Sequence, residues 1–200
     1  MKVAVSIALG ALPIAEAATP PPPMGPDDVA GFHRATVQPV TSIWFGKVQV
    51  VLESTAFSDV EQLGFSPVGQ HGDAGSFEMW KCYTLTDLGQ RVWLTSSELG
   101  GHKYITGVVA VVLRSPASAS NDCPPMATEF RPVHLDSGVW LGATLGSLSG
   151  MVEEALHPGA ETLGLYYEGK AGAYDVGSSL FLKFRDDKIV GLDAHRTTTN

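Results

Sequence analysis

Alternating apolar and polar positions predict β-strands along much of the chain after residue 40. The clearest case is "SSLFLKFRD" (178–186), in which Leu180, Leu182 and Phe184 fall on one side of an extended chain. The intervening positions carry Lys183 among others. Such a pattern is typical of an antiparallel strand with one dry face and one wet face.

The segment that follows, "KIVGLDAH" (188–195), has the pattern of a hairpin partner. A three-residue turn at 186–188 would place Leu182 opposite Leu192 and Phe184 opposite Val190. A two-residue turn would place a lysine opposite Val190 instead. Because register follows the hydrophobic pattern, we predict the longer turn.

The order of segments occurs twice. Each round begins with a helix-like stretch, for which Ser58 and Ser149 are N-cap candidates, and continues with three apolar segments. These segments span residues 78–85, 91–99 and 104–113 in the first round, and 163–169, 178–186 and 188–195 in the second. The last strand of each round contains a glycine, Gly107 in the first round and Gly191 in the second, and the two are 84 positions apart. We therefore predict an α+β fold of two tandem units, each a helix plus an antiparallel sheet, over residues 40–114 and 138–200, joined by a connector at 115–137.

The N-terminus has the layout of an export signal. "MKVAVSIALGALPIAEAATPPPP" places one lysine before a short apolar run, then the small-residue pattern Ala15-Glu16-Ala17. A retained membrane span is the weaker interpretation, because the run is short for a bilayer. We expect a signal peptide at 1–17, a Pro-rich disordered linker at 18–39, and a periplasmic or secreted protein.

The chain has two cysteines, Cys82 in a predicted strand and Cys123 in the connector. In an oxidising compartment the simplest arrangement is one disulfide between them. Two buried free thiols are the alternative. The bond would tie a strand of the first unit to the connector, and closing such a loop is worth roughly 3 to 4 kcal/mol in the chain-entropy model.

Charge and motifs narrow the classes of function. The formal net charge is −8, which gives no electrostatic attraction to nucleic acid or to anionic lipid. The six histidines have no metal-ligand spacing, and no nucleophile elbow, phosphate loop or dinucleotide fingerprint is present. We expect no metal, no cofactor and no catalytic centre.

The stretch "GVWLGATLGSLSGMVEEALHPG", followed by "LYYEG" and "SLFLKFRDDKIVGL", resembles the SmpA/OmlA-like and beta-lactamase-inhibitor-like repeat. That repeat has an "lG-x-T" entry to a helix and then a hairpin of strands, and the inhibitor proteins are tandem copies of it. The match covers 138–195 and, more weakly, 44–113. The sequence departs from it at His157-Pro158-Gly159 and in an insertion, "SPVGQHGDAGSF". The resemblance implies an exported, non-catalytic protein that binds other proteins.

The wet face of the sheet supplies the candidate binding residues. If corresponding strands of the two units point their alternate residues the same way, this face carries Arg91, Trp93, Phe181, Lys183 and Arg185. Asp193 and His195 of the last strand would join them. Tryptophan and arginine are enriched at protein interfaces. Trp93 and Phe181 would anchor a partner, and the basic residues would meet acidic groups. Alternatively, a linker, a helix or the other unit covers this face and Trp93 belongs to the core.

We therefore expect a protein of the cell envelope that binds another protein, as an inhibitor or immunity protein of an envelope enzyme or as an assembly accessory. The alternative is a periplasmic binder of small ligands, or a minor hydrolase, with a cleft lined by Tyr83, Tyr166 and Tyr167. A concave pocket with convergent polar groups would favour the second class, and a broad face would favour the first.

Overall fold

A computed structural model describes residues 18–25, 31–72, 77–98, 101, 103–114, 119–153, 156 and 159–199. The expected signal peptide at 1–17 lies outside the described residues. Eleven strands are found in the described part of the chain, most of them following the alternating stretches. They are β1 (Phe32–Arg34), β2 (Ser42–Phe45), β3 (Val48–Val51), β4 (Val68–His71), β5 (Glu78–Leu85), β6 (Gln90–Ser97), β7 (Gly107–Val112), β8 (Val133–Leu135), β9 (Thr162–Ala171), β10 (Tyr174–Arg185) and β11 (Lys188–Thr199).

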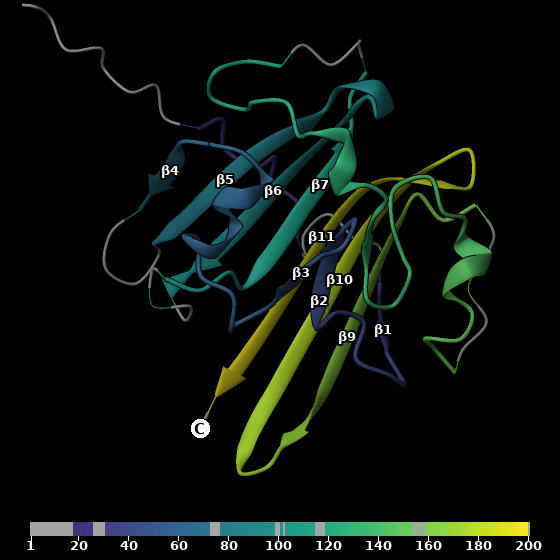
Figure 1. Cartoon of the computed structure of the whole chain (residues 1–200). Coiled ribbons are helices and arrows are strands. Elements are labelled where there is room, and N and C mark those ends of the chain that lie inside the picture. Colours follow the sequence, from purple (N-terminus) through teal and green to yellow (C-terminus); the bar gives the residue numbers. More distant parts are fainter. Residues whose placement is uncertain are drawn as a thin grey trace, which may run out of the picture.

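The strands form one large sheet and one small sheet (Figure 1). The large sheet has the order β1-β9-β10-β11-β7-β6-β5-β4, and the small sheet has the order β3-β2-β8. Every neighbouring pair is antiparallel except β1 and β9, which run parallel. The three strands expected in each round are present, and the last strands of the two rounds, β7 and β11, lie side by side at the centre. The two predicted units therefore share one continuous sheet.

The main core lies between the two sheets. Leu94, Leu180 and Leu192 point from the large sheet toward Ile43 and Phe45 of the small sheet, and all five are fully buried. We call this side of the large sheet the inner face and the opposite side the outer face. Because successive side chains of a strand point to opposite faces, the residues between these leucines lie on the outer face.

The expected α+β class is wrong, because the structure is mostly β and no α-helix is present among the described residues. The described residues contain short 3₁₀ helices instead, namely η2 (Asp59–Leu63), η3 (Thr86–Leu88), η5 (Thr128–Phe130) and η6 (Leu145–Leu148). Of these, η2 follows Ser58 and η6 ends just before Ser149, whereas η3 and η5 lie outside the stretches predicted to be helical. Ser58 makes no side-chain cap bond to η2, and Ser149 follows η6 instead of preceding a helix. Both stretches are short and interrupted by glycine, so few backbone hydrogen bonds are available to offset the cost of helix nucleation.

The β10–β11 hairpin shows why the predicted turn is only partly correct. Leu182 does lie opposite Leu192, but Phe184 lies opposite Ile189 and the turn contains two residues. Asp186 and Asp187 both have positive φ angles, 52° and 58°, as two-residue hairpin turns of type I′ require. A register shift between residues 183 and 184 absorbs the difference. A β-bulge thus reconciles the short turn with the hydrophobic pattern.

The register of the central strand pair is symmetric. Val109 of β7 lies opposite Asp193 of β11, Gly107 lies opposite His195, and Gly191 lies opposite Val111. The two glycines that the sequence places 84 positions apart thus occupy equivalent positions on either side of the Val109–Asp193 pair. Both glycines belong to the outer face, where the candidate site residues were expected.

Candidate functional site

A segment of the chain itself crosses the outer face. Residues 18–25, which we call the strap, run from β5 across β6 toward β11. The indole Nε1 of Trp80 donates a hydrogen bond to the carbonyl of Ala18 at 2.9 Å, and Nε1 of Trp93 donates to the carbonyl of Thr19 at 2.8 Å. At the other end, Met24 lies against Gly191 of β11. This segment was expected to be a solvated linker, yet Ala18 is only 2 % exposed.

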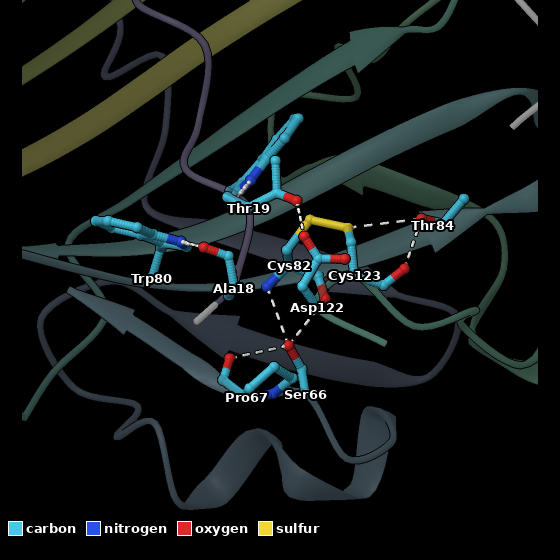
Figure 2. The surroundings of a disulfide bond; sticks show 10 residues. Ala18, Thr19, Ser66, Pro67, Trp80, Cys82, Thr84, Asp122 and Cys123 are labelled. Carbon is cyan, nitrogen blue, oxygen red and sulfur yellow. Dashed lines mark hydrogen bonds between the residues drawn. A yellow bond between two sulfur atoms is a disulfide. The ribbon is translucent and has the colours of Figure 1, made fainter. Parts of the chain in front are cut away.

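The disulfide lies beneath the strap (Figure 2). Cys82 and Cys123 are bonded as predicted, with their Cα atoms 4.8 Å apart. Ser66 Oγ donates a hydrogen bond to the carbonyl of Cys82 at 2.9 Å and accepts one from the amide of Cys82 at 3.1 Å. Thr84 Oγ1 donates to the carbonyl of Cys123 at 2.9 Å. Both cysteines are fully buried. The bond therefore fixes the connector onto the outer face of β5, as predicted.

The connector in turn holds the strap. Thr19 donates a side-chain hydrogen bond to Asp122, the neighbour of Cys123. Hydrogen bonds from Ser120 and Thr19, with a smaller contribution from the positive charge of Arg91, lower the pKa of Asp122. Arg91, one of the predicted binding residues, therefore lies beside this carboxylate. The strap, the connector and β6 form one connected group of contacts.

The predicted binding residues are brought to one face, but the two anchors are covered. Arg91, Trp93, Phe181 and Lys183 do share the outer face. Trp93 is 3 % exposed beneath the strap, and Phe181 is 8 % exposed, with Phe32 packed edge-on at a ring distance of 5.8 Å. The alternative interpretation, in which a linker covers the face, is therefore correct for the part around Trp93. Trp93 belongs to a second, smaller buried cluster, and Phe181 forms an aromatic pair with Phe32.

Lys183 and Arg185 lie toward the end of β10, away from the two tryptophans. Together with Glu161, Asp186 and Asp187 they line an open hollow of about 620 Å³ beside the β10–β11 turn. Arg185 is exposed and Lys183 is half-buried. Acidic and basic groups alternate around this hollow, so it has no dominant charge that would select an acidic partner.

A polar cluster occupies the centre of the outer face. Nε2 of His195 lies 2.5 Å from a carboxylate oxygen of Asp193, which is 5 % exposed. A β-carbon added at Gly107 would lie 2.3 Å from His195 Nδ1 and 2.8 Å from the hydroxyl of Thr95. The absence of a side chain at Gly107 thus allows the imidazole to lie flat across β7. Thr95 is fully buried, and its hydroxyl has no hydrogen-bond partner among the described residues.

This cluster does not form a relay of serine, histidine and aspartate. Burial alone would lower the pKa of His195, but the carboxylates of Asp193 and Glu78 outweigh it and raise that pKa. Ser179 lies opposite His195 on β10, whereas the second ring nitrogen lies over β7 on the other side of β11. A serine, histidine and aspartate relay would need that nitrogen to face the serine. The imidazole is therefore a partly exposed group held by Asp193, which favours its protonated form.

Beyond His195 the outer face is open. Two adjoining hollows of about 260 and 370 Å³ follow the ends of β9, β10 and β11, where these long strands extend past the small sheet (Figure 1). Their floor is made of small residues, including Gly177, Ser179 and Thr197, and Tyr166 forms a wall that is 36 % exposed. We call these two hollows together the trough. The strap does not reach this part of the outer face.

The cleft of three tyrosines, expected under the small-ligand alternative, is not formed. Tyr83 is fully buried on the inner face, where its hydroxyl lies 3.4 Å from the carbonyl of Gly64. Burial and the negative charge of Glu61 raise its pKa far above the usual range for tyrosine. Only Tyr166 and Tyr167 line the trough.

Comparison with models of protein families, with curated proteins and with solved structures finds no match to this chain. In the part of the chain that the structure describes, no helix is long and apolar enough to cross a membrane. Within the same residues, no three histidine, cysteine or acidic side chains gather closely enough to hold a metal ion. The function must therefore be argued from the outer face itself.

Sequence reasoning missed the residues that organise this face. Thr19 and Asp122 had no pattern to mark them, and nothing in the sequence indicated the hydrogen bond from Trp80 to the strap. Gly107 was noted only as a repeat marker. Its role as the floor beneath His195 follows from the pairing of β7 with β11, and strand order is not encoded in local periodicity.

Proposed function

We propose that this chain is an exported protein that binds an extended segment of another protein along the trough. The observation that carries the proposal is the trough itself, an open channel floored by small side chains and walled by the exposed ring of Tyr166. Exposed tyrosine beside accessible backbone is common at protein interfaces. Export is supported by the disulfide, which is typical of oxidising compartments.

An extended segment suits the trough better than a compact ligand. Pockets for small molecules are mostly enclosed and apolar, with a few polar groups that converge. Here the two hollows adjoin along the strands, share Glu168, Gly177 and Thr197, and open to solvent. His195, held by Asp193, stands at one end as a positively charged group below its raised pKa. A partner segment with an acidic residue at that end would fit the charge. An inhibitor of an envelope enzyme and an assembly accessory both belong to this class.

The test combines capture with a matched pair of variants. The oxidised chain is used as bait in an envelope extract, the captured protein is purified, and its affinity is measured by calorimetry. Tyr166→Ala combined with Thr197→Lys removes the wall and fills the floor, and should weaken binding at least about tenfold if the trough holds an interface hot spot. Tyr174→Ala is the control, because Tyr174 is 51 % exposed at the hairpin tip and lies outside the trough lining.

The result expected is a partner that the Tyr174 variant binds within about twofold of the native chain, while the trough variant loses it. Equal affinity for all three chains would place the interface elsewhere and refute the proposal. Failure to capture any protein, with the disulfide and the fold intact by circular dichroism, would also count against it.

A further inference from the structure

We propose that the groove beneath the strap is a recognition site for proline-rich segments of other proteins, and that residues 18–25 occupy it in cis. This site is separate from the trough, and the proposal does not depend on the function proposed above. Its floor consists of Trp80, Trp93, Val109, Val111 and Gly191. Its occupant in this structure has the sequence "ATPPPPMG".

Two tryptophan side chains hold the backbone of the strap just before its proline run. Aromatic-lined grooves bind extended proline-rich segments, which are already ordered before they bind. Here two indole N–H groups donate to two successive carbonyls, those of Ala18 and Thr19. Both bonds are directed at the peptide backbone, so the two tryptophans recognise an extended chain rather than particular side chains.

The direction of the strap explains why prolines suit this groove. The strap crosses β6 and β7, because its ends lie over Trp80 on β5 and Gly191 on β11. A segment that crosses strands cannot join their hydrogen-bond ladder. The four prolines at 20–23 are exposed or half-buried, and because proline has no amide hydrogen, this run has no donor that would need a partner from the ladder.

Two positions of the occupant are selected by side chain. Ala18 packs within the cluster of the disulfide and the two tryptophans, which leaves room for a small residue only. Thr19 donates its hydroxyl to Asp122. The groove therefore prefers a small residue, then serine or threonine, then prolines. A partner with this pattern would have to displace the strap, which belongs to the same chain and therefore competes at an effective concentration of roughly millimolar.

The experiment removes the strap without altering the groove. In the full chain, Ala18→Glu places a carboxylate where only a methyl group fits, so the strap should leave the groove. The probe is a fluorescent, capped Ala-Thr-Pro-Pro-Pro-Pro-Met-Gly peptide, titrated into the native chain and into the variant. We expect the variant to bind at least about tenfold more tightly, because the intramolecular competitor is gone.

Two controls identify the groove. Trp93→Phe, added to Ala18→Glu, keeps an aromatic ring but removes the indole donor, and should weaken the peptide about fivefold, as the loss of one hydrogen bond predicts. A peptide with alanines in place of the four prolines should bind more weakly than the probe. Near-ultraviolet circular dichroism and an intact disulfide confirm that each variant is folded. If Ala18→Glu does not fold, Thr19→Val, which removes only the bond to Asp122, replaces it with a smaller expected gain.

Several outcomes would overturn the proposal. Folded Ala18→Glu that does not bind the peptide at millimolar concentration would show that the strap is only a structural element. Binding that ignores both the indole donor and the prolines would have the same meaning. Binding of labelled native chain to Ala18→Glu, with no discrimination in favour of free peptide, would assign the groove to exchange between two copies instead of to a partner. Loss of the trough interface in the calorimetric test would leave all these results unchanged.

Discussion

Gly107 should tolerate no side chain, although it lies in a regular strand. A methyl group there would come within 2.3 Å of His195 Nδ1, 2.6 Å of Cε1 and 2.8 Å of the Thr95 hydroxyl. Ordinary contacts between such atoms begin near 3.4 Å. Thr95 is fully buried and cannot move aside, so the imidazole must shift by about 1 Å. That shift would pull Nε2 away from Asp193, which is itself buried.

The cost of Gly107→Ala has two parts. Overpacking of a filled site costs about 1 to 3 kcal/mol. Weakening a hydrogen bond to a buried carboxylate costs roughly another 1 to 2 kcal/mol, less than its full value because His195 is one-third exposed. We expect the free energy of unfolding to fall by about 2 to 5 kcal/mol, with both parts acting together.

Urea denaturation, followed by tryptophan fluorescence with the disulfide intact, measures this change. The control is Gly177→Ala, on β10 and the same face, where the nearest atom to an added β-carbon is the carbonyl oxygen of Thr197 at 3.9 Å. That variant should be neutral or slightly stabilising. Combining Gly107→Ala with His195→Ala should remove more than half of the cost, because the clashing ring is gone. A loss below about 0.5 kcal/mol, or full additivity with His195→Ala, would refute the reasoning.

Three further outcomes follow from the same face. The pKa of His195 is raised, so its pairing with Asp193 stabilises the fold below the ordinary histidine pKa of about 6.5, and the effect is lost as pH rises through the higher folded pKa. Stability measured by urea should therefore fall as pH rises above about 6.5, and His195→Gln should flatten that slope, whereas an unchanged slope would contradict the pairing. Replacing Cys82 and Cys123 by serine opens a loop of 41 residues, and should lower the free energy of unfolding by about 4 kcal/mol in the chain-entropy model. If denaturation shows a decrease of less than about 1 kcal/mol, the connector stays ordered without the bond. Trp93→Phe should increase the access of a protease to the strap while leaving the sheet protected, and equal digestion of both chains would show that the bond to Thr19 does not hold the strap.

The sequence predicted what depends on local periodicity. The alternation at Leu180 and Leu182 placed β10 correctly, and the two cysteines paired as the export pattern suggested. Helices were over-predicted because capping residues were present without enough helix-forming length behind them. Ser58 precedes only the five residues of η2. A cap contributes about 1 kcal/mol and cannot offset a costly nucleus.

The candidate site could be predicted only as far as one face of one sheet. Alternation placed Trp93 and Phe181 on the outer face, but it carries no information about what covers them. The strap lies 74 positions from Trp93 in the sequence and has no apolar period of its own. Proline content suggested a solvated linker, because the usual rule considers isolated chains. Here two indole donors and a buried alanine make an ordered element of it.

The symmetric pair of glycines has a consequence for how this chain can vary. Gly107 is covered by His195 from the opposite strand, whereas Gly191 faces Val111, a side chain that cannot cover it in the same way. Met24 of the strap fills that second niche. Gly191 is thus covered by a side chain of the strap, whereas Gly107 is covered by a side chain of the sheet itself. Positions 24 and 111 should therefore change together among relatives: a long residue at 111 would free position 24 to become small, and a strap without Met24 would require a longer partner at 111.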